Sequence, residues 1–368
     1  MDEESARKLL DEGATFILLD IPVGSELGID CNVYRIGEKF RGIKMIPRGL
    51  HFIYYSVVSN SDHKSLAPRT GFFHVFEARE MLVKKWHAFN EDISDEEVSE
   101  EEKYRFECNL RGTLDQFLAP YPLDNHRKWV GLTDYITESV LNALNPKCGK
   151  IKSVTELIPQ QYSSSHQSDN ELSSMRLSPS LSTNPEDLLP QMKANPESAI
   201  RFAEIPKQRH PLGATPSEIT KHNIDSSFIL QQLMSQNPDR LYILGELQFA
   251  FVSFLVGQVF DAFERWKLLL QIMCKSDEAI AKHTDIYINF IRVLYFQLEE
   301  APSDLFVDIV DKDNVLTRNL YEFFSNIELR EAIDENLRKR AQKFKRYLTN
   351  KFKWDFDTEP EDEAPVVV

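Results

Sequence analysis

The sequence has few of the features that mark secreted and membrane proteins. Its four cysteines are far apart and form no CxxC pair; they are Cys31, Cys108, Cys148 and Cys274. The opening residues MDEESARKLLDEG are charged and contain no apolar stretch like that of a secretory signal. The apolar run FAFVSFLVG is interrupted by Ser253 and Gly257 and is shorter than the roughly 20 residues that cross a bilayer. We therefore expect reduced thiols, no membrane segment, and a location in the cytoplasm and the nucleus.

Motifs of catalysis, cofactor binding and metal binding are also missing. The nine histidines include no HExxH and no pair spaced four residues apart, so a zinc site is not expected. No GxSxG elbow occurs. The stretch GEKFRGIK resembles a phosphate loop, but Ile43 follows Gly42 where a Lys is required. The sequence thus predicts no catalytic, cofactor-binding or metal-binding residues, and a protein that is not an enzyme.

Length and composition indicate two folded domains in an acidic chain. The chain has 368 residues, 42% of them hydrophobic, which suits two domains at roughly 150 residues each. Its formal net charge of -15 repels nucleic-acid phosphates, so any nucleic-acid contact needs a local basic patch. The acidic balance fits protein partners or simple solubility.

Residues 15–89 are typical of short β-strands. TFILLDIP, FRGIKMIP and LHFIYYSVVS are rich in β-branched and aromatic residues and are separated by Gly and Pro. Two further strands, GFFHVFEA and LVKKWHAF, flank the polar pair Arg79–Glu80. Phe72, His74 and Phe76 alternate with the residues between them, which predicts that these two strands form a β-hairpin.

Two helices are expected to follow and to pack on this sheet. The intervening run EDISDEEVSEEE holds eight acidic residues in twelve, which predicts a solvated loop or a helix start, with an acidic docking surface as the alternative. A first helix over 103–118 places on one face Phe106, Leu110, Leu114 and Phe117. A second, ending before Pro146, does the same with Trp129, Leu132, Ile136, Val140 and Leu144. Residues 1–155 are therefore predicted to form a β-rich domain, a sandwich-like sheet with two helices.

Residues 156–199 are predicted to be a flexible linker. Nine serines lie between Ser163 and Ser182, with scattered prolines and no apolar period. Such a composition does not bury enough surface to offset the entropy of ordering. Ser178 precedes a proline and is a candidate regulatory phosphorylation site.

Residues 200–353 are predicted to form an all-helical domain. The stretch IRFAEIP at its start is either a short strand or an ordered strap, and Thr215-Pro216-Ser217-Glu218 is typical of a capped helix start. Beyond it, five apolar stripes recur at helical spacing, with a turn at Gly257, and the last stripe runs from Leu329 to Leu348. Short connections favour a helical bundle or a short solenoid. The whole chain is thus predicted to be of the α+β class.

The final helix is strongly basic. RKRAQKFKRYLTNKFK, residues 338–353, carries eight basic residues in sixteen. Such a run either binds RNA or an import receptor, or is the solvated face of a helix whose other face holds Leu337, Phe344 and Leu348. The second interpretation is favoured.

Residues 354–368 are predicted to be a partner-binding tail. DFDTEPEDE has six acidic residues in nine, and the chain then runs through Pro365 to Val366, Val367 and Val368. β-Branched residues at the end of a polar, extended segment are suited to adding a strand to the sheet edge of a partner. Trp354 and Phe356 either anchor this tail in a partner's pocket or close the helical domain.

The chain resembles the Aar-two family of splicing factors. The resemblance spans both predicted domains, leaves out the acidic run and the serine-rich linker, and rests on these stretches: LLDIPVGSELGID, KFRGIKMIPRGLHFIYYS, PRTGFF, LDQFLAPYPL, RFAEIP, GATPSEITKHNIDSSFIL, LGELQFAFVSFLVGQVFDAFERWKLLL, YINFIRVLYFQLEEAPSDLFVDIV and KFKWDFDTEPEDEAPVVV.

This resemblance implies a fold, a partner and a role. It implies a β-rich domain joined to a helical domain like a VHS module. It implies an assembly factor of the U-five small nuclear ribonucleoprotein, which binds the RNase H-like and Jab/MPN-like domains of Prp-eight and keeps the helicase Brr-two away until assembly is complete. By the same resemblance the added strand of the tail falls on Val366, Val367 and Val368, with Pro365 as its entry. No direct nucleic-acid contact is expected, and RNA binding through the basic final helix remains the alternative.

Overall fold

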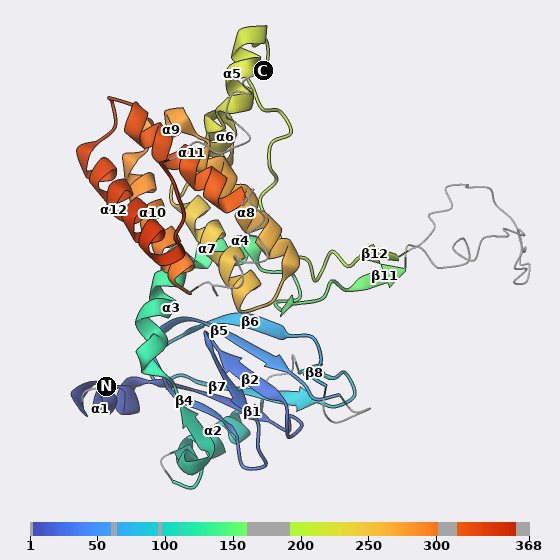
Figure 1. The fold of residues 1–368 in the computed structure, drawn as a ribbon. Coiled ribbons are helices and arrows are strands. Elements are labelled where there is room, and N and C mark those ends of the chain that lie inside the picture. Colours follow the sequence, from blue (N-terminus) through green and yellow to red (C-terminus); the bar gives the residue numbers. More distant parts are fainter. Residues whose placement is uncertain are drawn as a thin grey trace, which may run out of the picture.

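The computed structural model describes residues 3–59, 65–94, 98–110, 112–159, 192–300 and 315–357. A β-rich N-terminal part lies against a helical C-terminal part, with the helices above the strands in Figure 1. The predicted α+β class is confirmed. None of the helices within these ranges is both long and apolar enough to cross a membrane.

The N-terminal part is built from two five-stranded sheets. One sheet has the order β8-β7-β1-β4-β9 and the other the order β10-β6-β5-β2-β3. The strand bounds are β1 Ala14–Leu19, β2 Glu26–Ile29, β3 Asn32–Arg35, β4 Gly42–Ile46, β5 Gly49–Ser56, β6 Thr70–Phe76, β7 Met81–His87, β8 Asp92–Ile93, β9 Leu118–Pro120 and β10 Ile151–Lys152. Helix α1 spans Glu3–Glu12 and precedes them. Apolar side chains of both sheets fill the space between them, among them Phe16, Ile29, Ile53, Phe76 and Trp86.

The predicted hairpin between GFFHVFEA and LVKKWHAF is wrong. β6 pairs along its whole length with β5 in one sheet, and β7 pairs in parallel with β1 in the other. Between them Arg79 takes a left-handed conformation, with φ of 62°, and its N–H donates to the carbonyl of Glu12. This turn sends the chain across from one sheet to the other, so each strand finds its partner in its own sheet.

The helix predicted over 103–118 is shorter, and a strand follows it. Helix α2 spans Glu100–Leu110, a 3-10 turn spans Asp115–Phe117, and β9 then pairs in parallel with β4. Pro120 is tolerated in β9 because the strand lies at the edge of its sheet. The acidic run therefore contributes β8 and the start of α2, beside residues 95–97, which lie outside the described ranges.

The second predicted helix is in fact two helices that lie between the domains. α3 spans His126–Thr133 and α4 spans Glu138–Leu144, where the Thr137 hydroxyl caps α4 by accepting from the N–H of Val140. The prediction that this segment packs on the sheet is only half right. Trp129 donates from its indole N–H to the carbonyl of Leu50 on β5, but Leu132 and Leu144 lie in one core with the C-terminal helices.

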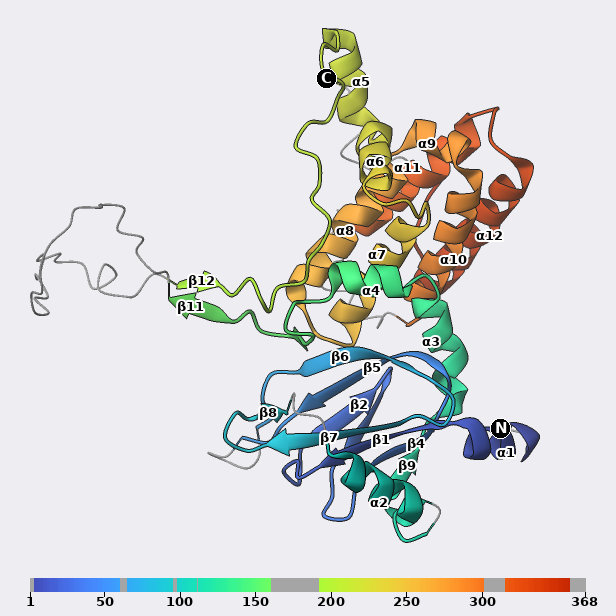
Figure 2. The ribbon, with the colours of Figure 1, turned by 180° about the vertical axis from the view of Figure 1, so that it is seen from behind.

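Part of the predicted linker is ordered. β11 (Leu157–Pro159) and β12 (Met192–Ala194) pair as an antiparallel ribbon that projects from the body of the molecule, as Figure 2 shows. Residues 160–191, which include Ser178, lie outside the described ranges. The stretch IRFAEIP contains no strand and is a strap, with Ile200, Phe202 and Ile205 packed on the helical core.

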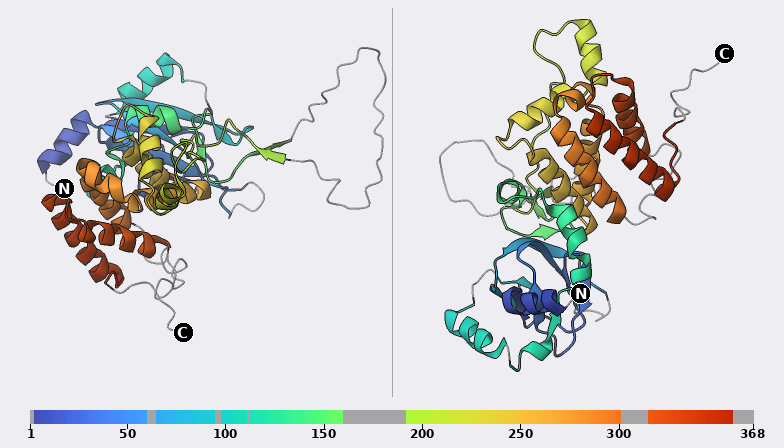
Figure 3. Two further views of the ribbon diagram at one scale, coloured as in Figure 1. Left: turned by 90° about the horizontal axis from the view of Figure 1, so that it is seen from above. Right: turned by 90° about the vertical axis from the view of Figure 1, so that its left-hand side faces the viewer.

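The C-terminal part contains eight helices within the described ranges (Figure 3). Their bounds are α5 Pro216–Ile224, α6 Ser227–Ser235, α7 Tyr242–Leu255, α8 Phe260–Cys274, α9 Asp277–Lys282, α10 Thr284–Glu300, α11 Val315–Leu329 and α12 Glu335–Phe352. The predicted capping box at Thr215 and Glu218 is present at the start of α5. Leu329, assigned from the sequence to the last helix, instead ends α11 and is exposed, because a turn at 330–334 separates it from α12.

Candidate interaction surfaces

Aromatic side chains join the two domains without a break. Phe73 points from β6 away from the sandwich and lies with its ring centroid 5.1 Å from that of Phe249 on α7. Phe52 on β5 lies 4.7 Å from Phe73 by the same measure. Because Phe52 and Phe73 continue the packing from the sheet to α7, the sheet and the helices share one apolar core. Two parts that share a core behave as one body rather than as beads on a string.

Arg69 adds a polar tie across the same junction. Its Nη1 donates to the carbonyl oxygen of Val256, at the end of α7, over 2.6 Å. Its guanidinium also lies 4.3 Å from the centre of the Tyr54 ring on β5. The planar cation stacks on the ring and caps a helix end at once, a combination that suits Arg better than Lys.

Gln248 of α7 fixes the turn between α3 and α4. Its Oε1 accepts from the backbone N–H of Tyr135 at 2.7 Å, and its Nε2 donates to Gly131 O at 3.1 Å and to Asp134 Oδ1 at 2.8 Å. Asp134 in turn pairs with Arg292 of α10 at 2.5 Å. The described contacts thus hold α3 and α4 in place between the sheet and the helices.

A buried ion pair holds the strap against the helices. Glu246 of α7 and Arg265 of α8 are both buried, with Arg265 Nη2 lying 2.6 Å from Glu246 Oε1. Burial raises the pKa of Glu246, and the Arg265 guanidinium opposes that shift. The guanidinium also faces the Phe202 ring of the strap at 5.5 Å. A charge buried this well depends on its partner, so neither residue is replaceable alone.

A second buried polar network lies in the N-terminal domain. His51 places Nδ1 2.7 Å from Asp30 Oδ2 and Nε2 2.8 Å from the carbonyl of Pro47. The Tyr121 hydroxyl donates to the same Asp30 oxygen at 2.6 Å, and the Phe52 N–H donates to the other at 3.0 Å. Burial and the neighbouring Asp30 carboxylate raise the pKa of the Tyr121 phenol, which keeps it a donor. Every member is paired, and the network joins β5 to the loops that carry Asp30, Pro47 and Tyr121.

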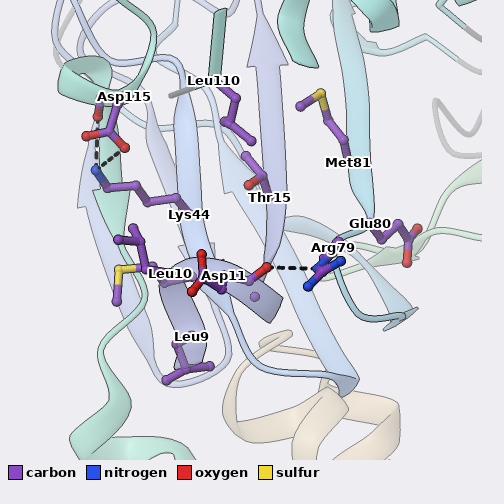
Figure 4. A pocket seen from close by; sticks show the side chains of 12 residues that line it. Leu9, Leu10, Asp11, Thr15, Lys44, Arg79, Glu80, Met81, Leu110 and Asp115 are labelled. Atoms are coloured by element: carbon purple, nitrogen blue, oxygen red, sulfur yellow. Dashed lines mark hydrogen bonds and ion pairs between the residues drawn. The ribbon is translucent and has the colours of Figure 1, made fainter. Parts of the chain in front are cut away.

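A cavity of about 400 Å³ lies on the outer side of the first sheet, between α1 and α2 (Figure 4). Apolar side chains of Leu9, Met81 and Leu110 line it, and charged groups stand at its rim. Figure 4 shows Lys44 directed at Asp115, to which its Nζ is bonded at 2.6 Å. Across the cavity Arg79 donates to the carbonyl of Asp11, so both cations are already engaged with this chain's own oxygens.

Among the residues that the structure describes, no cluster of three or more His, Cys, Asp and Glu side chains is placed to hold a metal ion. Of the cysteines, Cys274 is buried and the other three are exposed, and all four are free.

The C-terminal tail begins from a fixed root. Phe356 is buried, and its ring lies 5.1 Å from that of Phe324 on α11. Trp354 is half-buried and lies 6.2 Å from Phe356, edge to face. Of the two alternatives left by the sequence, the structure shows these side chains closing the helical domain. Pro365, Val366, Val367 and Val368 lie outside the described ranges.

The basic run occupies α12 as the favoured interpretation predicts. Leu337, Ala341, Phe344 and Leu348 are buried on one face, and the charged residues lie on the others. Several of the cations serve this chain: Lys351 donates to the carbonyls of Leu298 and Glu299, and Arg338 to those of Glu328 and Arg330. Burial lowers the pKa of Lys351 despite the nearby carboxylates of Glu299 and Glu300.

The residues that join the domains were not found by sequence reasoning. Arg69 lies in the stretch PRTGFF, which is part of the resemblance to the family. Nothing in the neighbouring residues shows that its side chain reaches Val256. Gln248 and Glu246 are polar positions within a strongly apolar helix, α7. Polar groups at otherwise buried positions need hydrogen-bond partners, so the presence of Gln248 and Glu246 in an apolar helix indicates that they contact other polar groups.

Comparison with known proteins covers both domains. A family model described as the AAR2 N-terminal domain matches residues 12–146, and one described as the AAR2 C-terminal repeat region matches residues 202–357. The Protein AAR2 homolog of Macaca fascicularis is 46% identical, over all of this chain and 96% of its own length. That of Homo sapiens is 45% identical over the same shares. The A1 cistron-splicing factor AAR2 of Saccharomyces cerevisiae is 24% identical over 86% of this chain and 85% of its own.

Proposed function

This chain belongs to the AAR2 family, and from that membership we propose that it is a splicing factor that assists assembly of the U-five small nuclear ribonucleoprotein. Its proposed partner is the scaffold protein Prp-eight, through the RNase H-like and Jab/MPN-like domains. While bound, it keeps the helicase Brr-two away until assembly is complete. Similarity over 86% of this chain to the yeast protein named as a splicing factor supports the role in splicing.

The proposed mechanism is occupancy rather than chemistry. The observation that carries it is the shared core at Phe73 and Phe249, because a two-domain body held in one arrangement presents both of its surfaces to a partner at once. Binding costs less when the interacting surfaces are already ordered. No enzymatic step is part of the proposal.

The tail adds a second kind of contact. Val366, Val367 and Val368, entered through Pro365, are proposed to add a strand to a sheet edge of Prp-eight. Main-chain hydrogen bonds would supply affinity and alternate valine side chains would supply register. Trp354 and Phe356 support this contact from within the helical domain, as the root from which the tail leaves.

Release and location complete the proposal. The protein works in the cytoplasm and the nucleus, and leaves its partner through competition or through modification of the segment 160–191. Ser178 is the proposed phosphorylation site there, because a phosphate adds nearly two negative charges at neutral pH.

A pull-down tests the proposal. The full chain is immobilised and offered the RNase H-like and Jab/MPN-like domains of Prp-eight, first singly and then joined. Retention of the joined fragment at near-stoichiometric amounts is expected, and prior loading should exclude Brr-two. Failure of the full chain to retain any of these fragments would overturn the proposed function.

The second candidate function is RNA binding through α12. The observation in its favour is the exposed basic face of that helix, and the net charge of -15 counts against it. A gel shift with spliceosomal RNA between roughly 50 and 200 mM salt tests it, since phosphate contacts make affinity fall steeply with salt. A shift that is absent or insensitive to salt removes this alternative.

A further inference from the structure

The chain reverses its direction after α12. Lys353 ends the helix in a left-handed conformation, with φ of 63°. Phe356 then packs on the helical core, and Asp357 Oδ1 lies 2.7 Å from Lys345 Nζ. Since Lys345 lies two turns before the end of α12, the chain is running back along the helix toward its N-terminal end when it leaves the described residues.

Lys345 is a residue of α12 that already binds carboxylates of this chain. Its side chain is only 14% exposed and pairs with Glu328 of α11 as well as with Asp357. Burial disfavours the Lys345 ammonium, but its hydrogen bonds to these two carboxylates outweigh the effect and raise its pKa. Asp357 of the returning chain is thus held by a cation of α12.

A row of exposed cations lies on the solvent side of α12, and Arg346 is the member of this row next to Lys345 in the chain. We call the exposed residues Lys339, Lys343, Arg346 and Lys353 the basic stripe. The first three are spaced by four and three residues and so share one face of the helix, and Lys353 follows at its C-terminal end. α12 is at the outer edge of the helical domain (Figure 3). Among the described residues, Lys339 pairs with Glu335 at 3.3 Å, and the other three have no ion pair.

The residues that come next are the acidic counterpart of this stripe. Glu359, Glu361, Asp362 and Glu363 follow Asp357 within six positions. Six extended residues reach about 20 Å at roughly 3.3 Å each, and the helix from Lys345 back to Glu335 is about 15 Å long at 1.5 Å per residue. The acidic segment is therefore long enough to face the whole N-terminal half of the stripe.

We propose that residues 359–363 dock within the same molecule along the basic stripe of α12 and form an acidic latch. The starting direction is set by Asp357 on Lys345, and the charges are complementary. A short tether gives the segment an effective concentration on the order of millimolar, which favours it over a free acidic peptide. Screening over about 8 Å at physiological salt confines the attraction to these neighbours, so the acidic remainder of the chain does not oppose it.

The latch does not depend on the proposed function. It makes a specific statement about the basic run: these cations serve the chain's own tail. If binding of a partner to the valine end of the tail opens the latch, the free energy of opening weakens that binding. An RNA that binds α12 has to displace residues 359–363 from the basic stripe.

A distance measurement on the full chain tests the latch. Cys31, Cys108 and Cys148 are changed to Ser, spin labels are placed through Gln342→Cys and Val366→Cys, and distances are measured by pulsed electron paramagnetic resonance. One short-distance population is expected, and its loss is expected in about 1 M salt, where screening acts over about 3 Å. It should also be lost when the four acidic residues of 359–363 are changed to Lys.

Two further variants test whether the opposite charges themselves hold the latch. Changing the four residues of the stripe to Glu, in the chain with the lysine tail, should restore the short population. The triple change Glu100, Glu101 and Glu102→Lys on α2, a similar charge change elsewhere, should leave it intact. Equal distributions in the native and lysine-tail chains overturn the latch, and so does failure of the double reversal. A short distance that disappears on dilution also overturns it, because the occupant would then be the tail of a second copy.

Discussion

Arg69 Nη1 donates a hydrogen bond to the carbonyl oxygen of Val256, 187 residues further along the chain, over 2.6 Å. This contact joins the segment before β6 to the end of α7 and so ties the sandwich to the helices. We expect Arg69→Ala to lower the free energy of unfolding by about 1.5–3 kcal/mol, the range for a hydrogen bond from a charged group.

Urea unfolding followed by circular dichroism measures this loss. The matched control is Arg48→Ala, since Arg48 is 70% exposed and pairs only with exposed Glu77. Its effect should stay within about 0.5 kcal/mol. Equal stability of the Arg69 variant and the native chain would mean that the guanidinium does not help to hold the domains together.

Gly245 lies where α7 closely approaches the turn after α3. A Cβ atom placed there would lie 2.4 Å from the carbonyl oxygen of Tyr135. Gly245→Ala should therefore force the backbones apart and destabilise the protein by about 1–3 kcal/mol. Gly37→Ala is the control, because a Cβ there meets no atom within 4 Å. Equal melting temperatures of the two variants would contradict the packing described at this junction.

The buried pair of Glu246 and Arg265 predicts a pH-dependent defect. Arg265→Met removes the cation that restrains the pKa of Glu246, whose folded-state value is already raised by burial. The variant should lose about 3–5 kcal/mol near neutral pH, the cost of leaving a buried charge unpaired. A carboxyl whose pKa is raised on folding stabilises the folded state fully at a pH below its pKa in the unfolded chain. That contribution is lost as the pH rises through its pKa in the folded chain.

The defect of Arg265→Met should therefore shrink as the pH falls from 7.5 toward about 4.5, near the ordinary value for Glu. Urea unfolding at the two ends of that range gives the comparison. The double change Glu246→Leu with Arg265→Met should recover most of the loss at every pH. A deficit that grows on acidification would show that Glu246 is not the group responsible.

Much of the fold was predictable because its signals are local. The capping box at Thr215 and Glu218, the turn at Gly257 and the apolar spacing of α7 and α8 depend only on neighbours in sequence. The failed hairpin prediction has a cause that is not local. Whether β6 turns back on β7 depends on strands elsewhere in the chain, since β5 pairs with the whole of β6 in one sheet and β1 pairs with β7 in the other.

The interaction surfaces were harder to predict for the same reason. The apolar face of α3 and α4 predicts that these helices are buried, but it does not predict which elements cover them. The core that they enter is formed with α7 and α10. The basic run was correctly assigned to a helix face. The reversal at Lys353, which brings Asp357 back to Lys345, needs a left-handed residue that no glycine marks.

The root of the tail and the tail itself should differ in their effect on stability. Phe356→Ala removes a buried aromatic ring and should cost about 3 kcal/mol or more. Removal of residues 358–368 leaves that ring in place and should lower the free energy of unfolding by no more than about 1 kcal/mol, the range for exposed ion pairs such as those of the latch. Phe89→Ala is the control, since Phe89 is 91% exposed. Equal losses from the truncation and from Phe356→Ala would contradict the claim that Phe356 belongs to the helical domain and that the residues after Asp357 do not.

The affinity of the chain for the joined RNase H-like and Jab/MPN-like fragment of Prp-eight, with and without residues 358–368, tests the central claim most directly. The truncation keeps Phe356 and Asp357, so a change in affinity reports on the tail and not on a damaged helical domain. We predict that the full chain binds and that the truncated chain binds at least tenfold more weakly, a difference of about 1.4 kcal/mol. Equal affinities of the two chains would contradict the role given to the valine end, and an absence of binding by both would contradict the account as a whole.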